Sequence, residues 1–217
     1  MRKIFIDGGA NVGQSITKFK DLYGETQDFE VFCFEASSSP HLLSKLNDSI
    51  EKNKNNFSSI TLYNKALHTY DGEVSFYDSG RESSSIIRKK NPNGKKITIE
   101  CTDLSNWIIN NFKKEDFVIL KLDVEGSEYE IIEKMIKDGS IEYVNTIVGE
   151  IHGLKSGHTR QDSHNLIESL EKCGKKLYIW PDVPPDHIKT FQDLTYYNKE
   201  LVDRNHTKWE KRFGIIK

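Results

Sequence analysis

The sequence predicts an α/β fold in which helices cover both faces of a mostly parallel central sheet. Short apolar runs typical of strands alternate with amphipathic helical patterns along the first half of the chain. Two of these runs, 30–36 and 116–124, are apolar on both faces, as buried parallel strands require. The chain has 217 residues, enough for one such domain with a full core, so we expect a single domain over residues 1–217.

The predicted elements follow in order along the chain. Strands are expected at 3–7, 30–36, about 59–64, 116–124, 143–152 and 175–182. Helices are expected at 13–23, from Pro40 to about 50, at 102–112, at 127–139 and at 162–173. Proline directly after Ser39 marks a helix start, and Gly139 marks a helix end.

Two regions depart from this alternation. Residues 72–101 contain short β-like pieces separated by Gly, Asn and Pro turns, which predict a small antiparallel β insertion. Within it, residues 79–87 are expected to form a loop near the acceptor, the molecule on which the protein would act. The C-terminal part, 154–217, is expected on the acceptor side. Its sequence beyond Pro185 predicts no clear elements, and the aromatic residues around it suit either a sugar-stacking platform or the core: Trp180, Phe191, Tyr196, Tyr197 and Trp209.

Composition excludes several classes of protein. A net charge of -2 gives no general attraction to nucleic acid or to anionic membranes. No apolar run approaches the roughly 20 residues that cross a bilayer, and the first residues do not form a signal peptide. The three cysteines, Cys33, Cys101 and Cys173, are far apart and suit buried thiols rather than a disulfide or zinc site. We therefore expect a cytoplasmic protein.

The turn after the first strand has the composition of a nucleotide-binding loop. A dinucleotide fingerprint, G-x-G-x-x-G, would need glycine where Ala10 stands. The alternative pattern D-x-G-x-x-x-G is satisfied by Asp7, Gly9 and Gly13, and it resembles motif I of class I S-adenosylmethionine-dependent methyltransferases. Glu35 ends the second strand, where an acid binds both ribose hydroxyls in such folds. Nicotinamide enzymes share that device, so Glu35 indicates an adenosine cofactor without choosing one.

The most specific stretch is LKLDVEGSEYEII (120–132), which places three acids directly after an apolar strand. With FIDGGANVGQS (5–15), FEA (34–36), KALHTYDGEVSFY (65–77) and SSSII (83–87), it resembles the FkbM family of methyltransferases. The hallmark of that family is a strand ending in K-[IL]-D-[VI]-E-G-x-E. The resemblance covers residues 3 to about 152. The N-terminal helices of many members have no counterpart here, and the last 60 or so residues align with nothing in the family.

The resemblance implies a class I methyltransferase (Rossmann-like) fold and transfer of a methyl group from S-adenosylmethionine, usually to a hydroxyl oxygen. Acceptors in the family include sugars and polyketides. The implied cofactor-binding residues are Asp7, Gly8, Gly9, Ala10, Asn11, Gly13, Glu35, Ala36, Lys65, Ala66 and Asp123. Asp123 and Glu125 would face the transferred methyl group or the acceptor.

A hydroxyl acceptor needs help to lose its proton at neutral pH. Glu150 and His152 stand two residues apart at the end of the fifth strand, so both side chains point to the same face. With Asp123 at the neighbouring strand end, they form either a general base or a site for Mg²⁺ or Mn²⁺. The predicted catalytic residues are Asp123, Glu125, Glu150 and His152, and the possible metal ligands are Asp123, Glu150 and His152.

The sequence therefore predicts an O-methyltransferase acting on a hydroxyl of a sugar or glycan. Alternatives keep the cofactor and change the acceptor to a lipid, peptide or polyketide hydroxyl, or leave a non-catalytic binding module. An NAD-dependent oxidoreductase is disfavoured by Ala10 and by the absence of a Tyr-x-x-x-Lys pair. The expected partner is a small-molecule or glycan acceptor.

Overall fold

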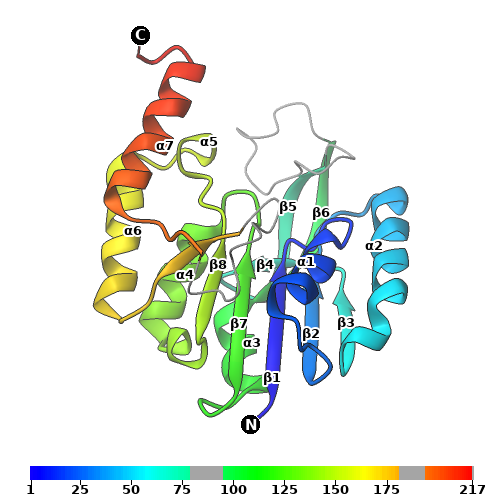
Figure 1. Ribbon diagram of the computed structural model, residues 1–217. Helices are drawn as coiled ribbons and strands as arrows, with labels where there is room; N and C mark the ends of the chain where they lie inside the picture. Colours follow the sequence, from blue (N-terminus) through cyan, green and yellow to red (C-terminus); the bar gives the residue numbers. More distant parts are fainter. Residues whose placement is uncertain (79–94, 181–193, 217) are drawn as a thin grey trace.

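The computed structural model describes residues 1–78, 95–180 and 194–216 (Figure 1). Within these residues, six strands pair in parallel to form the central sheet, in the order β3-β2-β1-β7-β8-β9. The strands are β1 (Lys3–Gly8), β2 (Phe29–Phe34), β3 (Ser59–Tyr63), β7 (Phe117–Leu122), β8 (Thr146–Gly149) and β9 (Leu177–Ile179). The predicted parallel α/β fold is confirmed.

Helices cover both faces of this sheet, as predicted. They are α1 (Gln14–Tyr23), α2 (Pro40–Asn53), α3 (Leu104–Asn111), α4 (Glu128–Asp138), α6 (Arg160–Lys172) and α7 (Lys199–Arg212). Successive side chains of a strand point to opposite faces. In β1, Phe5 accordingly packs in the core with α1 and α2, whereas Ile4 and Ile6 pack in the core with α3, α4 and α6. The central strand is therefore buried from both sides.

Aromatic side chains fill the core beneath α1. The rings of Phe5 and Phe19 stack with their centroids 4.1 Å apart, and Phe29 meets Phe19 edge-on at 5.0 Å. All three side chains are fully buried. Burial of each contributes about 1.5–3 kcal/mol to the stability of the fold. This core fixes α1, and therefore the loop that precedes it, against the sheet.

A second, three-stranded sheet has the order β4-β6-β5, from β4 (Ala66–His68), β5 (Gly72–Asp78) and β6 (Lys95–Asp103). Within the predicted insertion at 72–101, β5 pairs antiparallel with β6, as expected, and β4, which precedes the insertion, adds a strand parallel to β6. The chain reverses once after β4 and again after β5, so β6 runs in the direction of β4. The predicted loop at 79–87 lies outside the described residues.

The C-terminal part contains a helix that the sequence did not predict. Asn198 caps α7 by accepting a hydrogen bond from the backbone N–H of Leu201 at 2.9 Å. Leu201 and Val202 then pack in the same core as α4 and α6. Figure 1 shows α6 and α7 at one end of the sheet and α2 at the other. No helix among the described residues has the length and apolar character that crossing a membrane demands.

Candidate active site

Two glycines let the carboxyl ends of three strands approach one another closely. A Cβ atom added to Gly9, which has a positive φ of 77°, would lie 2.0 Å from the carbonyl oxygen of Asp123. One added to Gly149 would lie 1.9 Å from the carbonyl oxygen of Leu122. Neither distance is possible for a side chain, so glycine is needed at both positions. The segments after β1, β7 and β8 meet at this edge of the sheet as a result.

A cavity lies at the same edge. Nine of the residues predicted from the sequence line it: Gly9, Asn11, Glu35, Ala36, Lys65, Ala66, Asp123, Glu125 and Glu150. Apolar side chains that the sequence did not single out form another part of its wall: Phe34, Leu42, Leu67 and Phe76. Carboxylates therefore stand at one end of the cavity, an apolar wall at another, and Glu35 lies close to the glycine loop.

Four of the residues predicted to bind the cofactor do not line this cavity: Asp7, Gly8, Ala10 and Gly13. Asp7 is fully buried, where it accepts a hydrogen bond from the hydroxyl of Ser15 and forms an ion pair with Lys121. Ala10 belongs to the core beneath α1, and the carbonyl of Gly13 accepts a hydrogen bond from Ser49 at 2.9 Å. These residues stabilise the conformation of the glycine loop rather than lining the cavity.

Lys121 is a residue of the site region that the sequence prediction missed. Its Nζ lies 3.0 Å from Oδ1 of Asp7 and donates to the backbone carbonyl of Gly9 at 3.0 Å. Burial alone would lower the pKa of Lys121, but the charges of Asp7 and Asp123 overcome it and raise the pKa above its ordinary value. The sequence did contain a sign of this role, because Lys121 is a single cation inside an otherwise apolar strand.

The Glu35 carboxylate accepts two backbone hydrogen bonds. Oε2 accepts one from the N–H of Asn11 at 2.7 Å, and Oε1 accepts one from the N–H of Ser37 at 2.8 Å. Burial raises the pKa of this carboxyl above its ordinary value, although the two N–H groups act in the opposite direction. A carboxylate has about four acceptor positions. Glu35 therefore retains capacity to accept hydrogen bonds from a ligand in the cavity.

These features fit an adenosine cofactor that carries no phosphate. The apolar wall suits a purine ring, and Glu35 lies where it can accept hydrogen bonds from ribose hydroxyls. Glycine at position 9 lets the loop lie directly against the backbone of Asp123 at the edge of the cavity. The carboxylates of Asp123, Glu125 and Glu150 suit the positive charges of an ammonium or sulfonium group.

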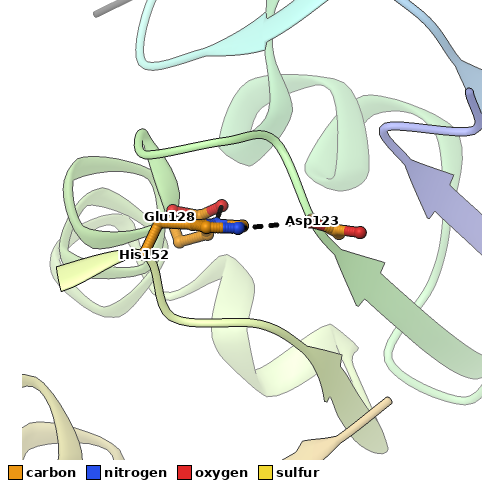
Figure 2. A group of neighbouring side chains, drawn as sticks. All are labelled: Asp123, Glu128 and His152. Atoms are coloured by element: carbon orange, nitrogen blue, oxygen red, sulfur yellow. Dashed lines mark hydrogen bonds and ion pairs between the residues drawn. The ribbon is translucent and has the colours of Figure 1, made fainter. Parts of the chain in front are cut away.

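His152 lies among four carboxylates. Figure 2 shows two of them, Asp123 and Glu128, beside the imidazole ring. Its Nδ1 is 2.9 Å from Oε1 of Glu128. Its Nε2 lies 3.4 Å from Glu150, 3.5 Å from Glu125 and 3.8 Å from Asp123. The ring is 5% exposed. The structure therefore brings together all four residues predicted to be catalytic, with His152 at their centre.

Glu128 is the second residue that the sequence prediction missed. It is fully buried in the first turn of α4, and its Oε1 also accepts hydrogen bonds from the backbone N–H groups of Val124 and Gly126, at 3.0 and 3.2 Å. It therefore fixes the loop after β7 as well as the imidazole ring. Glu125 in this loop has a positive φ of 62°, a conformation that non-glycine residues rarely adopt. The acid-rich run at 123–128 was the signal for Glu128.

The carboxylates around His152 differ in their affinity for protons. A hydrogen bond to His152 holds the pKa of Glu150 below its ordinary value. Burial raises the pKa of Asp123, and the negative charges of Glu150 and Glu128 add to this effect, while Lys121 and His152 oppose it. One ligand atom each from Asp123, Glu128 and His152 lie within 4.8 Å of one another, so these three could also hold a cation. The sequence predicted Asp123, Glu150 and His152 as possible metal ligands, and in the structural set Glu128 stands in place of Glu150.

Comparison with known proteins gives two matches. The family profile of the methyltransferase FkbM domain matches residues 7–177. The chain is also similar in structure to the methyltransferase FkbM from Methylobacillus flagellatus KT, with 13% sequence identity and a TM-score of 0.44. That match covers 95% of this chain and 36% of the solved chain, so this chain spans about a third of its length. No curated protein matches the chain.

Proposed function

Because the chain belongs to the FkbM methyltransferase family, we propose that it transfers a methyl group from S-adenosylmethionine to a hydroxyl oxygen of a sugar or glycan. When bound, S-adenosylmethionine supplies an electrophilic methyl group on a sulfonium sulfur. The protein must bind the cofactor, orient the acceptor and remove the proton of its hydroxyl group. Orientation matters because displacement at the methyl carbon is in line.

The observation that carries the proposal is the pairing of Glu128 with His152. A buried carboxylate 2.9 Å from Nδ1 accepts a hydrogen bond from it, so the neutral ring would carry its proton on Nδ1 and offer Nε2 as a proton acceptor. When Nε2 is protonated, it would donate to Glu150. Nε2 is directed to Asp123, Glu125 and Glu150, three residues that line the cofactor cavity. After Nε2 takes a proton, these carboxylates stabilise the imidazolium ion. His152 is therefore suited to act as a general base toward a hydroxyl group.

The same carboxylates support a polyhydroxylated acceptor. Glu125, Glu150 and Asp123 are partly exposed and present acceptor oxygens in one place. A sugar offers several O–H donors within a few ångströms, and such groups bind carboxylates well. In this proposal one hydroxyl group meets Nε2 of His152 and its neighbours donate to the carboxylates.

At the cofactor end of the cavity, Glu35 would accept hydrogen bonds from the ribose hydroxyls, and Ala66 would lie near the adenine edge with Leu67 and Phe76. Gly9 and Asn11 would line the amino-acid portion. Asp7, Gly8, Ala10 and Gly13 would act by shaping the loop. Lys65 lines the cavity and pairs with Glu100 at 2.7 Å.

A divalent ion such as Mg²⁺ or Mn²⁺ is the alternative means of activating the hydroxyl group. Asp123, Glu128 and His152 offer two oxygens and one nitrogen, a donor set that such ions accept. We favour the base, because Oε1 of Glu128 already accepts hydrogen bonds from His152 and from the backbone of Val124 and Gly126.

The test is calorimetry followed by a transfer assay. We expect S-adenosylmethionine and its demethylated product to bind, and NAD not to bind. Methyl transfer to a panel of sugars, lipids, peptides and polyketide alcohols then identifies the acceptor class. Activity that survives EDTA and rises with pH through about 6.5, the ordinary histidine pKa, supports the base. Activity lost with EDTA and restored by Mg²⁺ or Mn²⁺ supports the metal, and binding of NAD alone contradicts the proposal.

A further inference from the structure

A second cavity, of about 130 Å³, adjoins the first one. It is lined by the segment 150–155, by Tyr197, and by three residues of α7: Asn205, Lys208 and Trp209. The short helix α5 (Gly153–Ser156) and α7 lie side by side beyond the end of β8 (Figure 1). Glu150 lines both cavities, and His152 lines the second. A molecule in the second cavity would therefore meet a cofactor in the first at the carboxylates around His152.

Positively charged side chains line part of the second cavity. Nζ of Lys155 lies 4.1 Å from the centre of the Trp209 ring, and the guanidinium of Arg212 lies 4.8 Å from the same ring. Lys208 is exposed at the edge of the cavity. The lining of this cavity therefore carries both charges, a negative one from Glu150 and positive ones from Lys155 and Lys208.

Lys155 is held in an environment that disfavours its charge. Burial lowers its pKa, and the positive charges of Arg212 and Lys208 act in the same direction, while Glu150 and Asp123 oppose them. An anion placed beside Lys155 would offset this effect by restoring a favourable partner. The aromatic face of Trp209 stabilises the charge of the lysine only in part, because a cation–π contact is weaker than pairing with an anion.

A buried polar atom supports the presence of a polar ligand in this region. His206 is 5% exposed, and its Nε2 lies 2.8 Å from the hydroxyl of Ser163. Its Nδ1 has no hydrogen-bond partner among the residues that the structure describes. His206 lines a small cavity that shares Tyr197, Asn205 and Trp209 with the larger one. Buried polar atoms are usually paired, so a ligand or water is expected to complete this one.

We infer that the second cavity is the acceptor site and that the acceptor carries an anionic group, a carboxylate or a phosphate, together with the hydroxyl group that is methylated. This inference rests on the proposed methyl transfer. The anionic group would lie beside Lys155 and Lys208, and the hydroxyl group would point to His152. An acidic sugar has this combination of groups, with a ring that can pack against Trp209.

The test compares binding of glucose, glucuronate and glucose 6-phosphate, followed by the fluorescence of Trp209, with Trp209→Phe to identify the signal. We expect both acidic sugars, or one of them, to bind more tightly than glucose. Lys155→Met should weaken that binding by about tenfold or more, because it removes a charged hydrogen-bond partner. Lys211→Met is the matched control, since Lys211 is exposed on α7 and does not line the cavity. Cofactor affinity should be unchanged in both variants.

The outcomes separate the inference from the proposed function. Selective binding of glucuronate identifies a carboxylate, and selective binding of glucose 6-phosphate identifies a phosphate. Equal binding of glucose and the acidic sugars, no binding of any of them, or an affinity unchanged by Lys155→Met would overturn the inference while leaving methyl transfer intact. Binding that depends on Lys155 in a protein that does not bind S-adenosylmethionine would support the anion site and contradict the proposed function.

Discussion

The carboxylate of Glu128 and the imidazole of His152 form a buried pair, with Oε1 of Glu128 2.9 Å from Nδ1 of His152. The two residues come from different strand ends, because Glu128 begins α4 after β7 and His152 follows β8. Their meeting sets the orientation of the ring, and therefore the direction in which Nε2 points. The first prediction concerns this pair.

Replacing Glu128 with Gln should lower turnover by about 10²–10⁴-fold, because the amide can donate to Nδ1 and so shift the ring proton to Nε2. Glu128 acts through His152, so the pH dependence of turnover should change as well, while cofactor affinity should not. His152→Ala should lower turnover to the same extent. Glu130→Gln, a change on the exposed face of the same helix, is the control. Turnover within about threefold of wild type in both site variants would leave His152 a structural residue.

Asp123→Asn should leave the melting temperature near that of wild type and lower methyl transfer by about tenfold or more. Asp123 is partly exposed at a strand end and lines the cofactor cavity, so the fold depends on it little. Thermal unfolding and a transfer assay on the same preparation measure both effects. A variant that unfolds, yet keeps full specific activity in its folded fraction, would assign Asp123 to the fold instead.

The raised pKa of Glu35 predicts two opposite responses to pH. Folding favours the protonated carboxyl, so the unliganded protein should lose stability as pH rises from 4.5, the ordinary value, to the raised pKa. Cofactor affinity should increase over the same range, because only the ionised carboxylate accepts hydrogen bonds with both oxygens. Melting temperatures and calorimetry across this range test the two trends. Glu35→Gln should remove both, and a pH dependence that persists in this variant would point to another group.

Lys121→Met should destabilise the protein by about 3–5 kcal/mol, because it leaves the buried carboxylate of Asp7 without its cation. Replacing both partners, in Asp7→Asn with Lys121→Met, should recover part of this loss. Urea unfolding of the two single variants and the double variant measures the coupling between them. Lys137→Met, a change at an exposed position of α4, should alter stability by no more than about 0.5 kcal/mol. Additive losses in the double variant would show that the pair is not coupled.

The sequence predicted the parallel sheet and the covering helices because strands such as 117–122 are apolar except for Lys121 and the helices are amphipathic. It predicted Glu35, Asp123, Glu125, Glu150 and His152 as neighbours because parallel strands end at one edge of a sheet. It could not show that Asp7 faces the core, since that depends on the partner Lys121, more than one hundred residues away. Nor could it predict α7, whose helical face is mostly charged and whose packing depends on Leu201 and Val202 meeting other elements.

The position of β1 between β2 and β7 has a consequence for the order in which the chain folds. During synthesis β1 and β2 emerge early and can pair at once, whereas the other neighbour of β1 emerges only after residue 117. Pairing between strands so far apart in the chain is slow to form, because a long loop must close first. Until then, the hydrogen-bonding edge of β1 can pair with other chains. The side chain of Asp7, which is buried in the folded protein, also remains exposed. We therefore expect nascent chains in which β7 has not yet emerged to depend on chaperones more than the complete sheet does.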